Sequence, residues 1–135
     1  MEHEELTHKI IGCAYRVFNQ LGFGFLESVY KKAMIHELGK NSLKVEPEKP
    51  LSVYYDHVSV GEFFADLYVQ DSIIVELKSV QTILKEHEAQ LVNYLNAAKR
   101  KIGLIINFGP SGVEVKRKYR MSEQESKSIT PPEAD

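Results

Sequence analysis

The sequence predicts an α/β sandwich in which helices pack on a mixed β-sheet. Residues 4–20 and 83–99 carry apolar side chains at helical spacing, which indicates two amphipathic helices. Residues 62–69 and 73–78 form two apolar runs of the length of strands. Residues 102–108, IGLIINF, form a short apolar run that is typical of a strand buried on both faces. Helices and strands in this order favour a layered α/β fold.

The composition is that of one soluble globular domain. The chain has 135 residues, of which 43% are hydrophobic and 27% charged, and this balance argues against disorder and against a membrane protein. No apolar stretch approaches the ~20 residues that span a bilayer, and MEHEELTHK is too acidic and polar for a secretory signal. Cys13 is the only cysteine, so we expect no intramolecular disulfide and a cytoplasmic protein. We expect residues 1–120 to form the single domain.

Turn residues mark where the predicted elements end. The first helix ends before LGFGF at residues 21–25, whose two glycines make a tight break. A second helix is expected from about residue 26 to residue 38, with Gly39 and Asn41 as its stop signals. The segment KVEPEKP at residues 44–50 carries two prolines, and we expect it to be a connection.

A hairpin, an edge strand and a tail complete the prediction. Residues 51–62 predict a hairpin around Asp56 and His57, ahead of the two apolar strands. Residues 112–120 would add a final edge strand, and residues 121–135 have the composition of a disordered tail. The predicted order of elements is therefore α-α-β-β-β-β-α-β-β.

Two carboxylates and an amine lie in the strands that build the interior. Because side chains alternate across a strand, Glu76 and Lys78 are neighbours on one face, while Phe64, Asp66 and Tyr68 share a face of the preceding strand. An antiparallel register that sets Asp66 opposite Glu76 brings the two carboxylates within a few ångströms. This register makes Gln70, Asp71 and Ser72 a three-residue loop, whereas a two-residue loop would send Glu76 to the other face.

Such a carboxylate pair favours a metal site. Two carboxylates at that distance repel each other unless a cation lies between them. An all-oxygen ligand set with open positions for water and phosphate suits Mg²⁺ or Mn²⁺ better than zinc. Lys78 would then lie beside the metal, where its ammonium group positions a water or stabilises charge on a phosphate. The alternative is an ordinary salt bridge between Lys78 and an acid at a strand end.

These residues resemble a known signature. Asp66, followed by Glu76, Leu77 and Lys78 after a strand, is similar to the D…(D/E)xK pattern of the PD-(D/E)xK nuclease superfamily. GFLESVY at residues 24–30 matches the motif that names the GxxExxY protein family within it. The resemblance extends from about residue 10 to residue 108. It implies a restriction-endonuclease-like αβββαβ core, with a mixed central sheet flanked by helices and an extra N-terminal helix.

The resemblance also implies roles for individual residues. Asp66 and Glu76 would ligate the metal together with the carbonyl of Leu77, and Lys78 would serve the nucleophilic water. Ala65 stands where the superfamily name has a proline, a position that is widely replaced. Glu27 would be an additional metal ligand, either direct or through water.

The second predicted helix can also be interpreted without the resemblance. Glu27, Tyr30, Met34 and Leu38 fall on one helical stripe, so we expect Glu27 on the buried side. The alternative is that Glu27 lies in the first turn and merely complements the helix dipole. Tyr30 would pack in the core, and its hydroxyl group would then need a polar partner.

The third predicted helix contributes two supporting residues. Gln90 and Tyr94 are one turn apart on the shoulder of its apolar face. Their QxxxY spacing resembles a motif of the exonuclease-type branch of the superfamily, where these side chains line the active-site cleft. The alternative is that both are ordinary surface residues.

Two basic clusters are candidates for contact with nucleic acid. The formal net charge of −2 gives the chain as a whole no such tendency. The alternative is that both clusters are solvated surface. Their members are Lys99, Arg100, Lys101, Lys116, Arg117 and Lys118.

Three functions are compatible with these residues. The leading one is a Mg²⁺- or Mn²⁺-dependent nuclease that hydrolyses phosphodiester bonds of nucleic acid, with DNA as the expected substrate. The second is a catalytically inactive module that keeps the nuclease fold and binds nucleic acid or a protein. The third is a hydrolase for a small phosphorylated ligand. Apolar surface around Tyr54 and Tyr55 or on the first helix would support a homodimer.

Overall fold

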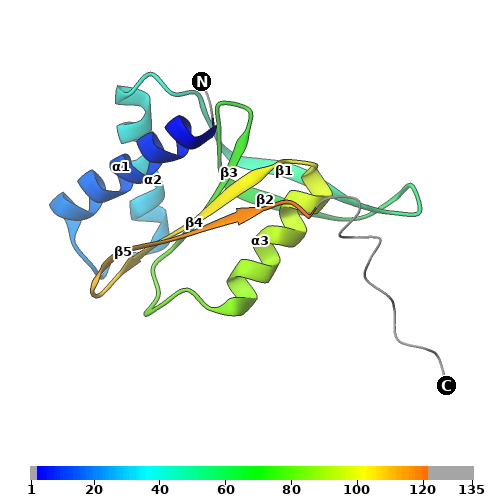
Figure 1. Ribbon diagram of the computed structural model, residues 1–135. Helices are drawn as coiled ribbons and strands as arrows, with labels where there is room; N and C mark the ends of the chain where they lie inside the picture. Colours follow the sequence, from blue (N-terminus) through cyan, green and yellow to red (C-terminus); the bar gives the residue numbers. More distant parts are fainter. Residues whose placement is uncertain (1–2, 122–135) are drawn as a thin grey trace.

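A five-stranded mixed sheet lies between two layers of helices in the computed structural model, which describes residues 3–121 (Figure 1). The helices are α1 (His3–Leu21), α2 (Glu27–Lys40) and α3 (Lys85–Ala98). The strands are β1 (Val45–Tyr55), β2 (Val58–Val69), β3 (Ile73–Lys78), β4 (Ile102–Gly109) and β5 (Gly112–Tyr119). They lie in the sheet in chain order; β3 and β4 are parallel and the other neighbours antiparallel. The predicted αβββαβ core is confirmed as α2, β1–β3, α3 and β4, preceded by the extra helix α1.

The two faces of the sheet carry separate hydrophobic cores. The larger core joins α1 and α2 to one face, and its members include Ile10, Met34 and Phe108. The smaller core joins α3 to the other face through Leu91 and Leu95. Every residue of β4 is buried, as expected for a strand covered on both sides. No helix among residues 3–121 is long and apolar enough to span a membrane.

The segment at residues 44–50 was wrongly predicted as a connection. Most of it belongs to β1, and β2 runs without interruption from Val58 to Val69, so three strands rather than four precede α3. Two prolines are tolerated because β1 is the edge strand, where a missing N–H leaves no partner unsatisfied. Asp56 and His57 both have positive φ, which is the type I′ turn that joins two-residue hairpins.

The regular alternation of side chains breaks in the middle of β2. Phe63 stacks on Tyr94 of α3, and Ala65 and Tyr68 both belong to the smaller core on the α3 face. Strict alternation would send residues 65 and 68 to opposite faces, so the expectation that Phe64 shares the face of Tyr68 was wrong. Phe64 is instead exposed. The break coincides with Glu48 of β1, which has φ 52° and lies between the regular pairs of this hairpin.

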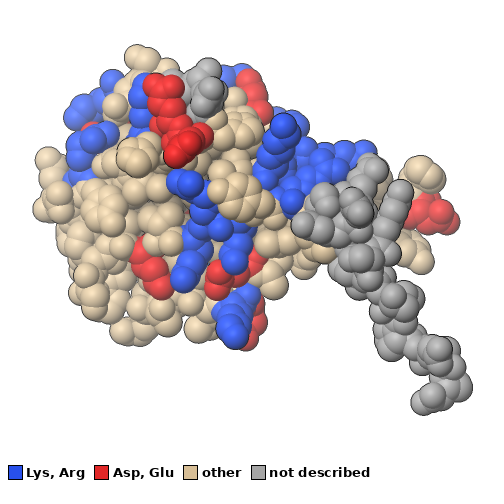
Figure 2. Space-filling view, viewed as in Figure 1, with Lys and Arg blue, Asp and Glu red and all other residues tan. Residues whose placement is uncertain are grey.

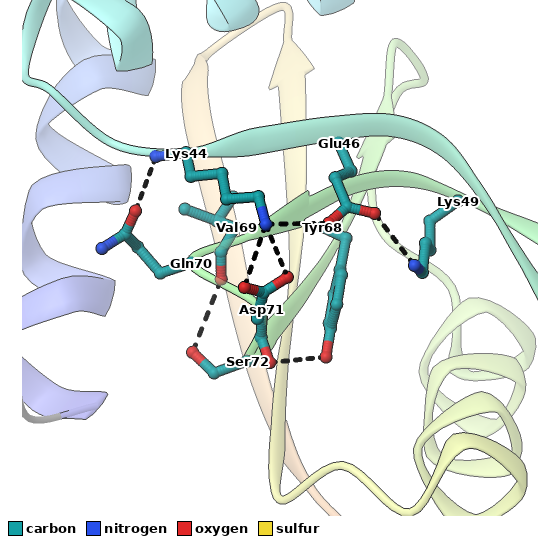
Figure 3. A network of polar contacts seen from close by, with 8 residues as sticks. All are labelled: Lys44, Glu46, Lys49, Tyr68, Val69, Gln70, Asp71 and Ser72. Atoms are coloured by element: carbon teal, nitrogen blue, oxygen red, sulfur yellow. Dashed lines mark hydrogen bonds and ion pairs between the residues drawn. The ribbon is translucent and has the colours of Figure 1, made fainter.

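The predicted register of β2 and β3 is confirmed. Leu67 pairs with Val75 and Val69 with Ile73, so the loop has three residues and the next opposed positions are Asp66 and Glu76. A polar network holds this loop (Figure 3). The Lys44 ammonium lies 3.1 Å from Asp71 Oδ2, the Lys44 N–H donates to Gln70 Oε1 at 2.6 Å, and the Tyr68 hydroxyl donates to the Asp71 carbonyl at 2.6 Å. These contacts stabilise the three-residue loop on which the register depends.

The predicted tail at residues 121–135 lies outside the described residues, except for Met121. The Met121 N–H donates to Asn96 Oδ1 of α3 at 3.1 Å. The chain therefore leaves the described domain beside the C-terminal half of α3.

Candidate active site

Asp66 and Glu76 meet where β2 and β3 emerge from their regular pairing. The Leu77 N–H donates to Asp66 Oδ2 at 2.8 Å, which ties the Asp66 side chain to the strand that carries Glu76. Ala65 and Leu67 on one strand and Val75 and Leu77 on the other are all buried, so both carboxylates project from rigid backbone. The sequence prediction that these two acids lie together agrees with this geometry.

The electrostatics of Glu76 are unusual. Burial, and after it the neighbouring charge of Asp66, raise the pKa of Glu76 to about 9, and Lys78 offsets part of this rise. Glu76 Oε1 is buried and has no hydrogen-bond partner among the described residues. A buried carboxyl oxygen without a partner is costly, because it has lost its hydration and gained nothing in return. The pair therefore presents a buried oxygen acceptor for which the described residues supply no partner.

Lys78 lies at the open end of β3. It is partly exposed and close enough to Glu76 to favour the ionised carboxylate. Among the described residues its ammonium group forms no ion pair within 4.0 Å, so the predicted alternative of an ordinary salt bridge at the strand end is not what the side chain does here. The ammonium is available to a ligand at the carboxylate pair.

Tyr94 and Gln90 of α3 complete this side of the site. Burial raises the pKa of Tyr94, and the charges of Glu76 and Asp66 add to the rise, while a side-chain hydrogen bond with Gln90 opposes it. Tyr94 therefore lies within electrostatic reach of both carboxylates. Phe63 stacks on the Tyr94 ring with centroids 3.7 Å apart, a contact that no spacing in the sequence indicated.

Glu27 does not lie where the helical stripe placed it. Tyr30, Met34 and Leu38 are buried as expected, but Glu27 is exposed. It is the first residue of α2 and lies in the first turn, ahead of the buried residues of the helix. Among residues 3–121 no group of three or more Asp, Glu, His or Cys side chains is close enough to share a metal ion. Asp66 and Glu76 are thus a pair, and Glu27 is not a third carboxylate in contact with them.

The loop before Glu27 nevertheless adjoins the ExK strand. Ser79, which directly follows Lys78, donates from its hydroxyl to the Phe25 carbonyl at 2.7 Å. Residues 23–27 and Ser79 line a common hollow of about 530 Å³. Glu27 thereby stands at the same end of the sheet as Lys78, although it does not touch the carboxylate pair.

Tyr30 holds the loop before Glu27 through hydrogen bonds of its hydroxyl group. Its hydroxyl donates to the Gly22 carbonyl at 2.5 Å and accepts the Phe25 N–H at 3.3 Å. Its ring stacks on Phe108 with centroids 4.3 Å apart. The expected core position and polar partner of Tyr30 are therefore confirmed, and its role is to position the loop that precedes Glu27.

Asn107 anchors the loop that follows Lys78 and was not singled out from the sequence. This fully buried side chain accepts the Val80 N–H at 2.9 Å and donates to the Val80 carbonyl at 2.9 Å. Glu114 accepts the Ile83 N–H at 2.9 Å, and mainly for this reason its pKa lies below the ordinary value. The sequence could have indicated Asn107, because an amide inside the apolar run of residues 102–108 needs a hydrogen-bond partner.

The structure divides the predicted basic clusters. Lys118 forms an ion pair with Glu88 of α3 at 2.7 Å, whereas Arg117 points to the other face and donates to Thr7 Oγ1 of α1 at 3.1 Å. Lys116 is exposed. Lys99, Arg100 and Lys101 lie between α3 and β4, and the Arg100 guanidinium lies 5.5 Å from the centre of the Tyr68 ring. Lys101 lines a hollow with His3 and Glu4 of α1 and Arg117 of β5, whereas Lys99 lines one between α3 and the β1–β2 hairpin. Neither cluster therefore stays together on one surface.

Comparisons with known proteins indicate the family to which the chain belongs. Residues 4–118 match the model of a family described as the PD-(D/E)XK nuclease superfamily. A search of curated proteins finds no match. Among solved structures, the chain is similar to one titled "Crystal structure of SSO0001", with a TM-score of 0.58 and 17% identity over 73% of this chain and 52% of that chain. The chain thus spans about half the length of that relative, and the likeness is one of fold. Since the family match covers most of the sequence, the protein belongs to the PD-(D/E)XK nuclease superfamily.

Proposed function

We propose that the protein is a divalent-metal-dependent nuclease that hydrolyses phosphodiester bonds of nucleic acid, with DNA as substrate. The observation that carries the proposal is the carboxyl group of Glu76, which is buried beside Asp66 and leaves Oε1 without a partner. A divalent cation would bind the free oxygen of Glu76, and its charge would offset the repulsion between the two carboxylates.

The donor set fits Mg²⁺ or Mn²⁺. Asp66 and Glu76 would hold the ion together with the carbonyl of Leu77, and all of these donors are oxygens. Because Glu76 keeps a proton in the metal-free protein, metal binding releases that proton, and affinity rises with pH. Glu27 would act through water or on a second ion. When bound, the ion activates water for attack and neutralises charge on the phosphate.

The remaining residues would position the reacting groups. The Lys78 ammonium lies beside Glu76 and would orient the attacking water or stabilise the charge that develops on the phosphate. Tyr94 and Gln90 would restrict the open side of the carboxylate pair. The rigid backbone of β2 and β3 keeps these groups in place without rearrangement on binding.

We also assign the chain to the GxxExxY family, on the motif GFLESVY at residues 24–30. The loop that this motif forms is held by Tyr30 and by Ser79, which explains why the tyrosine and the residue after ExK belong to one unit. A cytoplasmic location stays a prediction, with which the buried free thiol of Cys13 is compatible.

A second candidate is a binding module that keeps the fold without cleaving nucleic acid. The observation that favours it is the position of Glu27, which lies apart from the carboxylate pair. Such a module would bind nucleic acid or a protein partner and would not need Lys78.

Metal titration and cleavage assays distinguish the two functions. Calorimetric titration of Mg²⁺ and Mn²⁺ into the wild type is expected to show binding that Asp66→Ala and Glu76→Ala abolish. Cleavage of mixed single- and double-stranded DNA and RNA is expected to disappear in the same variants. Glu62→Ala, which removes an exposed carboxylate from β2, is the matched control. A wild type that neither binds metal nor cleaves any of these substrates overturns the nuclease function and leaves the binding module.

A further inference from the structure

A hollow lies between the β1–β2 hairpin and the C-terminal half of α3. The hairpin projects beyond the body of the protein, and α3 ends beside it (Figure 1). The hollow has a volume of about 940 Å³, within the range of about 300–1,000 Å³ that is usual for ligand clefts. Its lining includes Tyr54, Asp56 and His57 from the hairpin and Asn93, Asn96 and Lys99 from α3 and its end.

The chemistry of this lining suits unpaired bases. Tyr54 is 65% exposed, so one face of its ring is free to stack on a planar ligand. Asn93 and Asn96 are three residues apart on α3 and offer amide groups to the same hollow. The oxygen of Asn96 already accepts the Met121 N–H, which leaves its NH₂ group to donate. Aromatic stacking and amide contacts are how proteins bind bases that have no partner strand.

Positive charge accompanies the hollow. Lys99 is part of its lining and Arg100 follows directly in the chain, whereas Lys101 lines another hollow beside α1 and β5. Figure 2 shows Lys and Arg side chains gathered between the body and the tip of the hairpin. Asp56 at the hairpin turn contributes one opposing charge. Lys99 and Arg100 together exceed this one negative charge, which favours a polyanion over a neutral or basic partner.

The hollow lies in line with the candidate active site. Phe63 of the hairpin and Tyr94 of α3 stack on each other between the hollow and the carboxylate pair. Tyr94 is within electrostatic reach of that pair. Asp66 and Ser59, the partner of Tyr54, are seven residues apart on β2, which is about 23 Å at the rise of a strand. A nucleic-acid strand of several nucleotides spans that distance.

We propose that the hollow binds a single-stranded segment of the nucleic-acid substrate, with a base stacked on Tyr54 and a phosphate at Lys99. The inference rests on the proposed function, because it assigns the strand beside the same site. A duplex fits the hollow less well, since its bases are already stacked on each other and present only their edges.

Binding without metal tests the inference separately from cleavage. The probe is a fluorescein-labelled oligothymidine of roughly 16 nucleotides, the long end of single-strand site sizes, followed by fluorescence anisotropy in EDTA. Tyr54→Ala is expected to weaken binding about 10-fold, the loss of one base–aromatic stack. Lys99→Ala is expected to reduce the slope of log affinity against log salt by about 0.7, the loss of one phosphate contact.

Tyr55→Ala is the matched control. Tyr55 is adjacent in the chain and 75% exposed, but it does not line the hollow, so the variant is expected to bind like the wild type. A hairpin duplex of the same length is expected to bind at least about 10-fold more weakly than the single strand. Lys32→Ala, on the opposite helical layer, controls for the loss of one charge. Circular dichroism spectra establish that each variant is folded.

The outcomes separate this inference from the nuclease function. Loss of binding in Tyr54→Ala and Lys99→Ala, with no cleavage by the wild type in Mg²⁺, supports the strand site and refutes the nuclease. Cleavage by the wild type, with equal binding by Tyr54→Ala and Tyr55→Ala or by strand and duplex, overturns the strand site alone. A wild-type dimer that Tyr54→Ala dissociates, with binding of the probe unchanged, overturns it in favour of a second copy.

Discussion

Glu76→Gln tests the electrostatics of the carboxylate pair. In the metal-free protein, burial and the charge of Asp66 raise the pKa of Glu76 from its ordinary value of 4.5 to about 9. Between these values the folded protein keeps a proton that the unfolded chain has released, so the free energy of unfolding falls as pH rises. The slope is about 1.4 kcal/mol per pH unit, which amounts to about 4 kcal/mol from about pH 5 to about pH 8.

The substitution removes this dependence on pH. Glutamine has nearly the shape of the protonated carboxyl group and does not ionise, so Glu76→Gln is expected to become more stable than the wild type as pH rises. Urea unfolding in EDTA at a series of pH values measures the difference between the two proteins, which cancels the contributions of the groups that do not interact with Glu76. Glu62→Gln changes an exposed carboxylate of β2 and is expected to follow the wild type.

Magnesium provides the complementary measurement. Above about pH 7, addition of Mg²⁺ is expected to stabilise the wild type, because the cation replaces the proton on Glu76 and binds only the folded site. Glu76→Gln is expected to gain much less, since it has lost a charged ligand. Parallel curves of stability against pH for the wild type and Glu76→Gln in EDTA would refute the reasoning, because they would show that Glu76 ionises in the folded protein without penalty.

Three further substitutions test other parts of the structure. Tyr30→Phe removes the hydroxyl group that bonds the Gly22 carbonyl, and we expect a loss of about 1–3 kcal/mol in the free energy of urea unfolding; an unchanged stability would show that water replaces the bond. Gly103→Ala places a methyl group 2.9 Å from Leu91 Cδ1, so thermal unfolding is expected to report about 1–3 kcal/mol of destabilisation, and a fully retained melting temperature would contradict the tight packing of α3 on β4. Lys78→Met is expected to leave calorimetric metal binding nearly unchanged and to lower the rate of DNA cleavage about 100-fold, and a variant that cleaves like the wild type would remove Lys78 from the mechanism.

Local patterns in the sequence were sufficient for most of the secondary structure. The apolar stripe of α1, the buried strand β4 and the turn at Asp56 and His57 are all where their patterns indicated. These patterns depend on periodicity and turn chemistry, which neighbouring residues determine. Residues 44–50 were misassigned because proline is permitted at a sheet edge, and edge position depends on which strands pair elsewhere in the chain.

The candidate site was predictable in part. Alternation predicted that Asp66 lies opposite Glu76 on the condition of a three-residue loop, and the structure meets that condition. Glu27 was misplaced because helical periodicity gives the direction of a side chain but not which turns of the helix the rest of the protein covers. The role of Phe63 could not be predicted from the sequence. Its stack on Tyr94 joins segments about thirty residues apart, and the side-chain alternation of β2 is interrupted beside it.

The sequence by itself determined the helices, most strands, and the acids and lysine of the candidate site, while the structure decided between the two possible loop lengths that join β2 and β3. Tertiary structure alone decided how those groups behave. Burial of Glu76, the separation of Glu27 from it, and the hollow between the hairpin and α3 all depend on which distant surfaces exclude water or approach each other. Such exclusion arises only when the sheet and its two helical layers assemble, because desolvation and long-range contacts are properties of the packed chain and not of any one segment.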